Sequence, residues 1–314
     1  MLNRRHLRVK VLQALYAFFQ NKDEEYAKTE KTMMQNIDKI YDMYLLLLMT
    51  FEELKLIALD RIEENKKKLR PTEEDLNPNR KWIDNAVVAF LENNKEIKNE
   101  AEYRKISWEG AENKEMFRKM FLAAREGETF FSHLDNGLTG EEEDKRFAIE
   151  VFKEEIANNE LLQYYFEDQN IQWIDDLDLV CSMVIKTIKG FEGGKMEIMP
   201  LYKDKKDEMA FVKDLLRKTI DMEKENEALI DELTSNWDLE RIAKMDIILM
   251  KMALTEMQIF SNIPTKVSLN EYIEISKFYS TPKSNSFING VLDKAIARLT
   301  ADEKIKKTGR GLMN

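Results

Sequence analysis

The chain contains a single cysteine, Cys181, among 314 residues. An internal disulfide needs two cysteines and a cysteine-based metal cluster needs several, so neither can form. The longest apolar run, residues 44–49, is also far too short for a membrane span of about 20 residues. No secretory signal is recognisable at the start of the chain. We therefore expect a cytoplasmic protein without a membrane partner.

Glycine and proline are scarce, with 10 and 5 residues. Both residues interrupt helices, and their scarcity combines here with many Leu, Lys, Glu and Met residues, which favour helices. Hydrophobic residues make up 43% of the chain and charged residues 34%, a balance suited to a globular protein. Because strand patterns are almost absent, the sequence predicts an all-α fold.

The side chains of a catalytic site are missing as well. The two histidines, His6 and His133, are far apart in the chain, and no Ser or Cys nucleophile has a recognisable setting. The glycine-rich segment 190–195 lacks both the spacing and the Ser or Thr of a phosphate-binding loop. We expect no enzymatic activity, no cofactor, no metal site and no small-molecule substrate.

The net charge of -10 argues against nonspecific coating of nucleic acid, which depends on Lys and Arg. The positive charges are nevertheless concentrated at the two ends. The first twenty residues contain Arg4, Arg5, Arg8 and Lys10 without any acid, and the tail 304–310 is basic. Two basic ends on an acidic protein indicate a local contact with RNA.

Residues 4–20 predict a first helix whose apolar residues recur at helical spacing. Its arginines lie at the N-terminus, where cations oppose the helix dipole by about 0.3–1 kcal/mol each. Acids would be favoured there if only folding mattered. We therefore interpret Arg4, Arg5 and Arg8 as functional residues with little structural use.

Residues 263–299 predict two helices joined by a polar turn at 280–286. Ser268 and Glu271 have the spacing of a capping box in the first of them. Gly290 lies within the second, where glycine costs about 1 kcal/mol relative to alanine. We expect close approach of another backbone or of a ligand at Gly290.

Apolar periodicity predicts further helices at 28–68, 82–91, 100–125 and 142–158. A glycine- and proline-containing linker is expected at 190–206.

Four motifs near the C-terminus occur together over about 65 residues, which makes them far more specific than one short pattern. They are Trp237-Asp238-Leu239-x-Arg241-Ile242-Ala243, Lys251-Met252-Ala253-Leu254-x-Glu256-Met257, Ile263-Pro264-x-Lys266-Val267-x-x-Asn270-Glu271 with Ser276-Lys277, and Phe287-Ile288-Asn289-Gly290-Val291-Leu292-Asp293-Lys294. In order and spacing they resemble the transcription antitermination factors of the NusB family.

The first helix resembles the same family through Arg4-Arg5-x-x-Arg8 followed by Gln13-Ala14-Leu15-Tyr16. The chain departs from the family pattern at His6, Leu7, Val9 and Lys283, which could change the affinity for RNA or for a partner.

The resemblance implies a NusB-like bundle of two helical subdomains. It also implies that the protein binds the boxA element of ribosomal RNA together with NusE, a ribosomal protein, within an antitermination complex of RNA polymerase. The implied RNA-binding residues are Arg4, Arg5, Arg8, Gln13, Tyr16, Phe287, Asn289 and Gly290. Glu256 is the implied partner contact. Tyr16 and Phe287 could stack on unpaired bases or could equally be core aromatics.

The chain is more than twice as long as ordinary members of that family. We expect an N-terminal helix at 1–20, an expanded helical region of unknown role at 21–207, a NusB-like domain at 208–302 and a basic tail at 303–314. Two alternatives stay open: a helical scaffold that does not bind RNA, and the RNA-binding subunit of a methyltransferase.

Overall fold

The computed structural model describes residues 1–21, 25–234 and 242–312, and its regular structure is helical. No β-strand occurs in these ranges, and the only ladder-like pairing there is an isolated bridge between Glu192 and Lys195. The all-α prediction is confirmed.

The chain divides into two compact units. Unit 1 contains Asp38–Leu201 together with Met1, and unit 2 contains Leu2–Ile37 and Tyr202–Asn314. The first boundary falls inside helix α2 (Tyr26–Lys66). The second falls inside the segment 190–206 that the sequence predicts as a linker.

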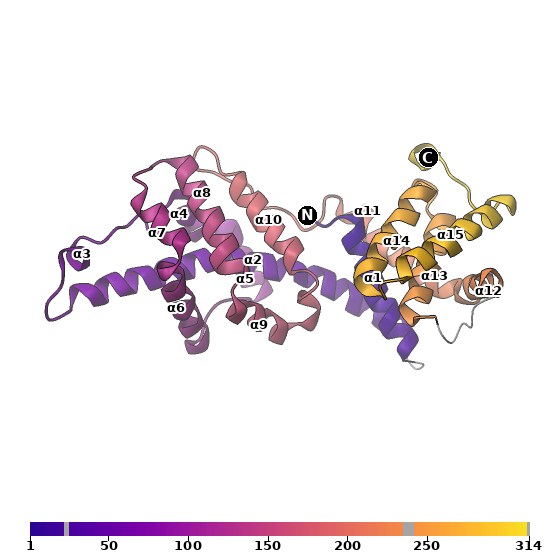
Figure 1. Ribbon diagram of the computed structural model, residues 1–314, viewed down its shortest axis with the longest axis horizontal. Coiled ribbons are helices and arrows are strands. Elements are labelled where there is room, and N and C mark those ends of the chain that lie inside the picture. Colours follow the sequence, from indigo (N-terminus) through magenta and orange to yellow (C-terminus); the bar gives the residue numbers. More distant parts are fainter. Residues whose placement is uncertain (22–24, 235–241, 313–314) are drawn as a thin grey trace. The chain divides into compact units, whose positions relative to one another are not determined.

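Unit 1 is built around the part of α2 that follows Ile37 (Figure 1). Its other helices are α3 (Glu73–Leu76), α4 (Ala86–Asn93), α5 (Lys95–Arg104), α6 (Ala111–Glu126), α7 (Glu128–Asp135), α8 (Glu141–Val151), the π-helix η1 (Phe152–Ala157), α9 (Glu160–Gln169), the 3-10 helix η2 (Ile171–Trp173) and α10 (Leu177–Lys189).

Aromatic rings fill the core of unit 1. Phe51 of α2 stacks on Trp82 and Phe152, with ring centroids 6.1 and 6.0 Å apart. Trp82 also packs against Phe130 and Phe147 at 5.3 Å. Such contacts add to the free energy of burying apolar area, so this cluster holds α7 and α8 onto α2.

The prediction of one helix at 100–125 is wrong, because the structure has two. Helix α5 ends before Lys105, whose φ of 57° is left-handed, and α6 begins after Gly110, whose φ is 119°. Between them, the indole nitrogen of Trp108 donates to the carbonyl of Leu46 at 2.9 Å. A long-range anchor therefore interrupts a pattern that is locally helical.

The other helix predictions for this unit hold with shifted ends. The predicted helix at 28–68 is α2, and the one at 142–158 is α8 followed by η1. The predicted helix at 82–91 begins later, at Ala86, because the side chain of Asn85 caps it by accepting from the amides of Val87 and Val88.

Unit 2 is organised around α13 (Lys244–Ile259), whose described neighbours pack on it from several directions (Figure 1). These are α1 (Arg4–Gln20), α11 (Lys205–Asp221), α12 (Glu223–Leu233), α14 (Thr265–Tyr279) and α15 (Ser284–Ala301), and a 3-10 turn η4 (Gly309–Leu312) ends the described chain.

Helix α13 is buried on nearly all sides, so each of its polar side chains needs a partner inside the protein. Asp246 accepts from the hydroxyl groups of Ser280 and Ser284. Lys251 pairs with Glu227 at 2.6 Å and with Glu223 of α12 at 3.3 Å. The third buried charge, Glu256, belongs to the site described below.

The predicted pair of helices at 263–299 is confirmed as α14 and α15. The predicted capping box at Ser268 and Glu271 is wrong, because α14 begins at Thr265 and no side chain caps it. The hydroxyl of Ser268 instead donates to Glu256. A Cβ built on Gly290 would meet no atom within 4 Å, so close packing within the described chain does not explain this glycine.

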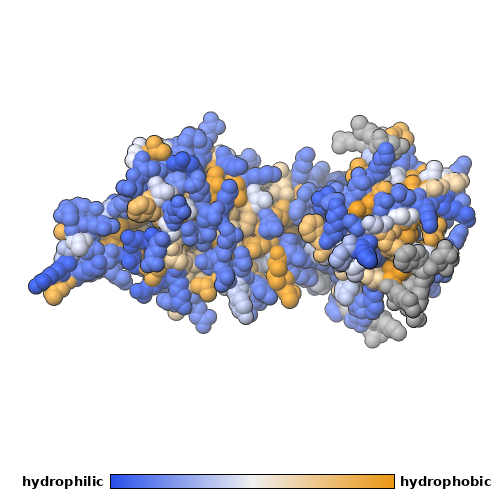
Figure 2. Space-filling model, in the orientation of Figure 1, coloured by the Kyte–Doolittle hydropathy of each residue, from blue (hydrophilic) through white to orange (hydrophobic). Residues whose placement is uncertain are grey.

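The face shown in Figure 2 is mainly hydrophilic, with apolar residues scattered among charged ones. No helix among the described residues is long and apolar enough to cross a membrane.

Lys105 provides a test of the break between α5 and α6. A left-handed residue other than glycine is strained by about 1–2 kcal/mol, so Lys105→Gly should stabilise the protein by up to about 1 kcal/mol. The matched control is Lys119→Gly at an exposed interior position of α6, which should destabilise it by about 1 kcal/mol. Urea unfolding measures both changes, and a loss of stability in Lys105→Gly would show that the residue is not strained.

Candidate nucleic-acid interface

The start of α1 is fixed by a cap and by an apolar stripe. The side-chain oxygen of Asn3 accepts from the amide of His6 at 3.0 Å. Leu7, Val11 and Leu15 are fully buried on one face. With that face held, the arginines of the first turns must project toward α11, α13 and α14.

Arg4 and Arg5 form partly exposed ion pairs with acids from distant helices. Arg4 pairs with Asp207 of α11, and its guanidinium lies 4.0 Å from the ring centroid of Phe211. Arg5 makes two bonds to Glu271 of α14, at 2.8 and 2.9 Å, and its side chain is 45% exposed. The bonds from Arg5 hold the pKa of Glu271 below its usual value, although burial acts in the opposite direction.

Arg8 is different because it is buried, with 2% of its side chain exposed. It binds the carboxylate of Glu256 with two bonds, at 2.7 and 2.8 Å, and Glu256 itself is fully buried. The same carboxylate accepts from Ser268 at 2.7 Å and from the hydroxyl of Tyr272 at 2.9 Å. Burial opposes the charge of Arg8, but the bonds to Glu256 outweigh it and raise the pKa of Arg8.

The interpretation that all three arginines have little structural use is therefore wrong for Arg8. Its guanidinium and the carboxylate of Glu256 satisfy each other inside the core. Loss of one member of such a pair leaves a buried charge without its partner, at a cost of about 3–5 kcal/mol. The acids that compensate the basic helix start come from α11, α13 and α14 instead of from α1 itself.

The three arginines line one open depression on unit 2. Its other lining residues are Asn3, Asp207, Asn262, Ile263, Pro264, Val267 and Glu271. A wide depression suits a chain that lies across it better than a small enclosed ligand.

His6 does not add a positive charge at neutral pH. Burial, together with the nearby charge of Arg5, lowers its pKa to about 4. Its Nδ1 atom is buried without a hydrogen-bond partner among the described residues. The side chain at position 6 is therefore neutral here.

The other residues predicted to contact RNA lie at separate positions on α1 and α15. Tyr16 is 41% exposed on α1, so it is not a core aromatic, and Gln13 is half-buried. Phe287 is half-buried and lines a separate depression with Lys283, while Asn289 bonds to Asp293 at 3.3 Å. Gly290 is exposed on α15.

Glu256, predicted to contact a partner protein, lies in the core and not at the surface. The family motif identified Glu256, but it could not show whether this side chain points to the surface or into the core. Its contacts are Arg8, Ser268 and Tyr272, so direct contact with a partner is excluded in this conformation.

The basic tail packs on unit 2. The ammonium group of Lys307 donates to the carbonyl of Phe260 at 3.0 Å, and burial lowers its pKa. The hydroxyl of Thr308 bonds to that of Ser261, and a Cβ on Gly311 would lie 1.9 Å from the Ser261 carbonyl oxygen. The tail thus contacts unit 2 through Lys307 and Thr308, while Lys304 and Lys306 stay exposed.

Sequence analysis missed the acids that complete the site, Asp207 and Glu271. Glu271 was expected in a capping box with Ser268, and it lies 266 positions from Arg5. No local pattern links residues so far apart.

These features define unit 2 as an all-helical domain with a charged, open surface site. No group of three or more metal-ligating side chains occurs among the residues that the structure describes. Residues 177–297 match the model of the NusB family, so this part of the chain is similar to that family. The match begins at α10 and does not include α1.

Individual relatives agree with the family match. The chain is 43% identical over 103 residues to the transcription antitermination protein NusB of Salinibacter ruber, covering 33% of this chain and 64% of the relative. It is 46% identical over 79 residues to that of Chloroherpeton thalassium, covering 25% and 37%. For that of Natranaerobius thermophilus the identity is 39% over 70 residues, covering 22% and 50%.

The chain thus covers less than two thirds of the length of these relatives. No solved structure matches it. The first part of one quoted motif, Trp237 to Arg241, lies outside the described residues.

The buried ion pair between Arg8 and Glu256 can be tested by a double-mutant cycle. Glu256→Met should destabilise the protein by about 3–5 kcal/mol, because the charge of Arg8 stays buried. Arg8→Met combined with Glu256→Met should cost less than the sum of the single changes. Urea unfolding of the four proteins gives the coupling energy, and additive effects would contradict a direct interaction.

His6 predicts a pH effect of known sign. Its pKa in the folded protein, about 4, is below the ordinary value of 6.5, so folding disfavours the protonated form. Its contribution to stability is complete above pH 6.5 and is lost as the pH falls toward about 4. Proton NMR titration measures this pKa, with His6→Gln assigning the signal, and titration near 6.5 would contradict the burial argument.

Proposed function

We propose that this protein is a transcription antitermination factor that binds boxA-containing RNA together with NusE, in a complex with RNA polymerase. The observation that carries the proposal is the match to the NusB family model at 177–297, with relatives named as antitermination proteins. The work proposed is binding and assembly, without a chemical step.

The RNA contact is proposed at the start of α1. Exposed ion pairs contribute only about 0–1 kcal/mol, so an RNA phosphate can replace Asp207 at Arg4 or Glu271 at Arg5 at small cost. Guanidinium groups bind phosphate with two parallel bonds, as Arg5 now binds its carboxylate. These two arginines are therefore the proposed phosphate contacts.

Arg8 is proposed to act indirectly. Moving it to RNA would leave Glu256 buried and unpaired, which costs more than an exposed phosphate contact contributes. Arg8 and Glu256 are then positioning residues that hold α1 against α13 and α14. The pair of Arg8 and Glu256 is then necessary for RNA binding because it fixes where Arg4 and Arg5 lie.

Bases are proposed to contact the exposed residues of α1 and α15. Tyr16 has enough exposed ring to stack on an unpaired base. Gly290 has open space beside it, so a ligand can approach the α15 backbone there. Gln13, Phe287 and Asn289 complete the proposed set.

The domain roles follow from this proposal. Residues 1–20 and 208–302 carry the RNA contact, residues 21–207 add contacts with polymerase or ribosomal protein, and the tail 303–314 supports unit 2. The experiment below distinguishes this proposal from the alternative of a scaffold that does not bind RNA. A methyltransferase subunit is not favoured by the family match.

The test is binding of a labelled boxA RNA, with and without NusE, at two salt concentrations. Arg4→Gln with Arg5→Gln should weaken binding about tenfold or more and make the salt slope shallower by roughly 0.7 per lost phosphate contact. The fold should be unchanged, since both pairs are exposed.

The matched control is Arg80→Gln with Arg118→Gln, which removes the same charge from exposed arginines of unit 1. Arg80 resembles Arg5 closely, because it is 48% exposed and makes two bonds to one carboxylate. Equal weakening by both double variants would overturn the α1 site. If the unaltered protein binds the RNA under none of these conditions, the proposal is wrong and the scaffold alternative remains.

A further inference from the structure

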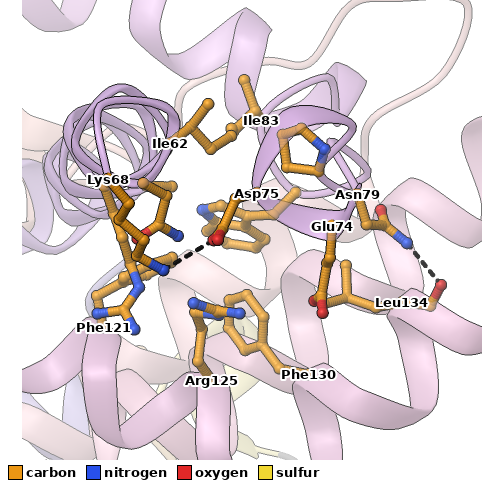
Figure 3. A pocket seen from close by; sticks show the side chains of 15 residues that line it. Ile62, Lys68, Glu74, Asp75, Asn79, Ile83, Phe121, Arg125, Phe130 and Leu134 are labelled. Atoms are coloured by element: carbon orange, nitrogen blue, oxygen red, sulfur yellow. Dashed lines mark hydrogen bonds and ion pairs between the residues drawn. The ribbon is translucent and has the colours of Figure 1, made fainter. Parts of the chain in front are cut away.

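Unit 1 contains a pocket of about 240 Å³ that the proposed function does not use. It lies among the end of α2, α3, α6 and α7, all within unit 1. Figure 3 shows Lys68 joined to Asp75 and Asn79 joined to the carbonyl of Leu134, with Arg125 and Phe130 in the lower part of the view.

Two buried donors at this pocket lack acceptors. The indole Nε1 of Trp82 and the guanidinium Nε of Arg61 are buried without a hydrogen-bond partner among the described residues. Trp82 is only 3% exposed. Buried donors are nearly always paired in folded proteins, and an unpaired one lowers stability. Two of them at one pocket indicate a ligand with acceptor atoms.

The charges at the pocket favour a negative ligand. Three cations line it, Arg61, Lys68 and Arg125, against two acids, Glu74 and Asp75. Lys68 and Asp75 neutralise each other at 2.8 Å. Neither Arg61 nor Arg125 has an ion pair within the described part of the chain. Arg125 is exposed and Arg61 is half-buried, so both guanidinium groups can bind an anion that enters the pocket.

The remaining walls are aromatic and aliphatic. Trp82, Phe121 and Phe130 supply rings, and Ile62 and Ile83 supply aliphatic surface. Ligand pockets for drug-sized molecules have roughly 300–1,000 Å³, so this one suits a smaller molecule. Three aromatic rings among the lining residues favour a planar group.

We propose that this pocket binds a small organic anion, a planar ring that carries a carboxylate or a phosphate. Arg61 and Arg125 bind the anionic group, and the indole N–H of Trp82 donates to one of its oxygens. The ring lies among Phe121, Phe130 and the aliphatic side chains. The segment 21–207 then has a binding site of its own, which composition and motifs did not indicate.

The test uses NMR of the full-length protein, which has four tryptophans and so four indole N–H signals. Trp82→Phe identifies the signal of Trp82. The probes are indole-3-acetate for a carboxylate source and adenosine monophosphate for a phosphate source, with inorganic phosphate as the anion without a ring. We expect a saturable downfield shift of the Trp82 signal with at least one ring-bearing probe at millimolar concentration.

Two arginines of α6 give a matched pair of variants. Arg125→Gln should weaken binding of the probe about tenfold or more, since a bond to a charged group is lost. Arg118→Gln, two turns earlier on the same helix and outside the pocket, should leave it unchanged. The same loss of charge in both variants isolates the local contact from the overall charge.

Arg61→Met separates a binding role from a structural one. It removes an unpaired buried donor, so binding should be lost while the Tm stays equal or rises. A lower Tm with binding unchanged would overturn the role of Arg61.

Two outcomes would overturn the site as proposed. An equal response to inorganic phosphate would remove the requirement for a ring and leave an adventitious anion only. No saturable shift of the Trp82 signal with any probe would show that the pocket binds no ligand of this class.

Discussion

Unit 2 depends on the buried ion pair between Arg8 and Glu256, which joins residues 248 positions apart. Four hydrogen bonds converge on one carboxylate, from the two nitrogens of Arg8, from Ser268 and from Tyr272. The pair therefore ties α1 to α13 and α14 at one point. It also explains how a helix with a basic first turn is stable, because the compensating charge is supplied by neighbouring helices.

Arginines occur in three settings in this chain, which burial and partners distinguish. Arg8 is buried with a matched acid and holds the fold together. Arg5 is half-exposed with an acid that can be exchanged, which suits a reversible contact with phosphate. Arg61 presents a buried donor without an acceptor, which suits a ligand that brings one. The same side chain thus has different chemistry in each setting, and sequence alone does not separate these roles.

Much of the fold could be predicted from helical periodicity. The bounds of α1 were predicted correctly, and α2, α14 and α15 were predicted nearly so, because long amphipathic stretches repeat one signal many times. The break at Lys105 was not predicted, since it depends on the hydrogen bond from Trp108 to Leu46, 62 residues away in the chain. The sequence predicted Arg4, Arg5 and Arg8 at the start of the first helix, but it predicted neither the depression that they line nor their acid partners.

The sequence by itself determined the helical class, the position of the first helix and the motifs that point to the NusB family, since these are properties of short stretches. Tertiary structure alone decided that Glu256 and Arg8 are buried, that His6 is neutral, that the tail packs on unit 2 and that Trp82 and Arg61 share a pocket. The physical reason is that helical periodicity constrains which residues share a face. How deeply that face is buried, and which charged groups lie against it, depend on the packing of helices distant in sequence.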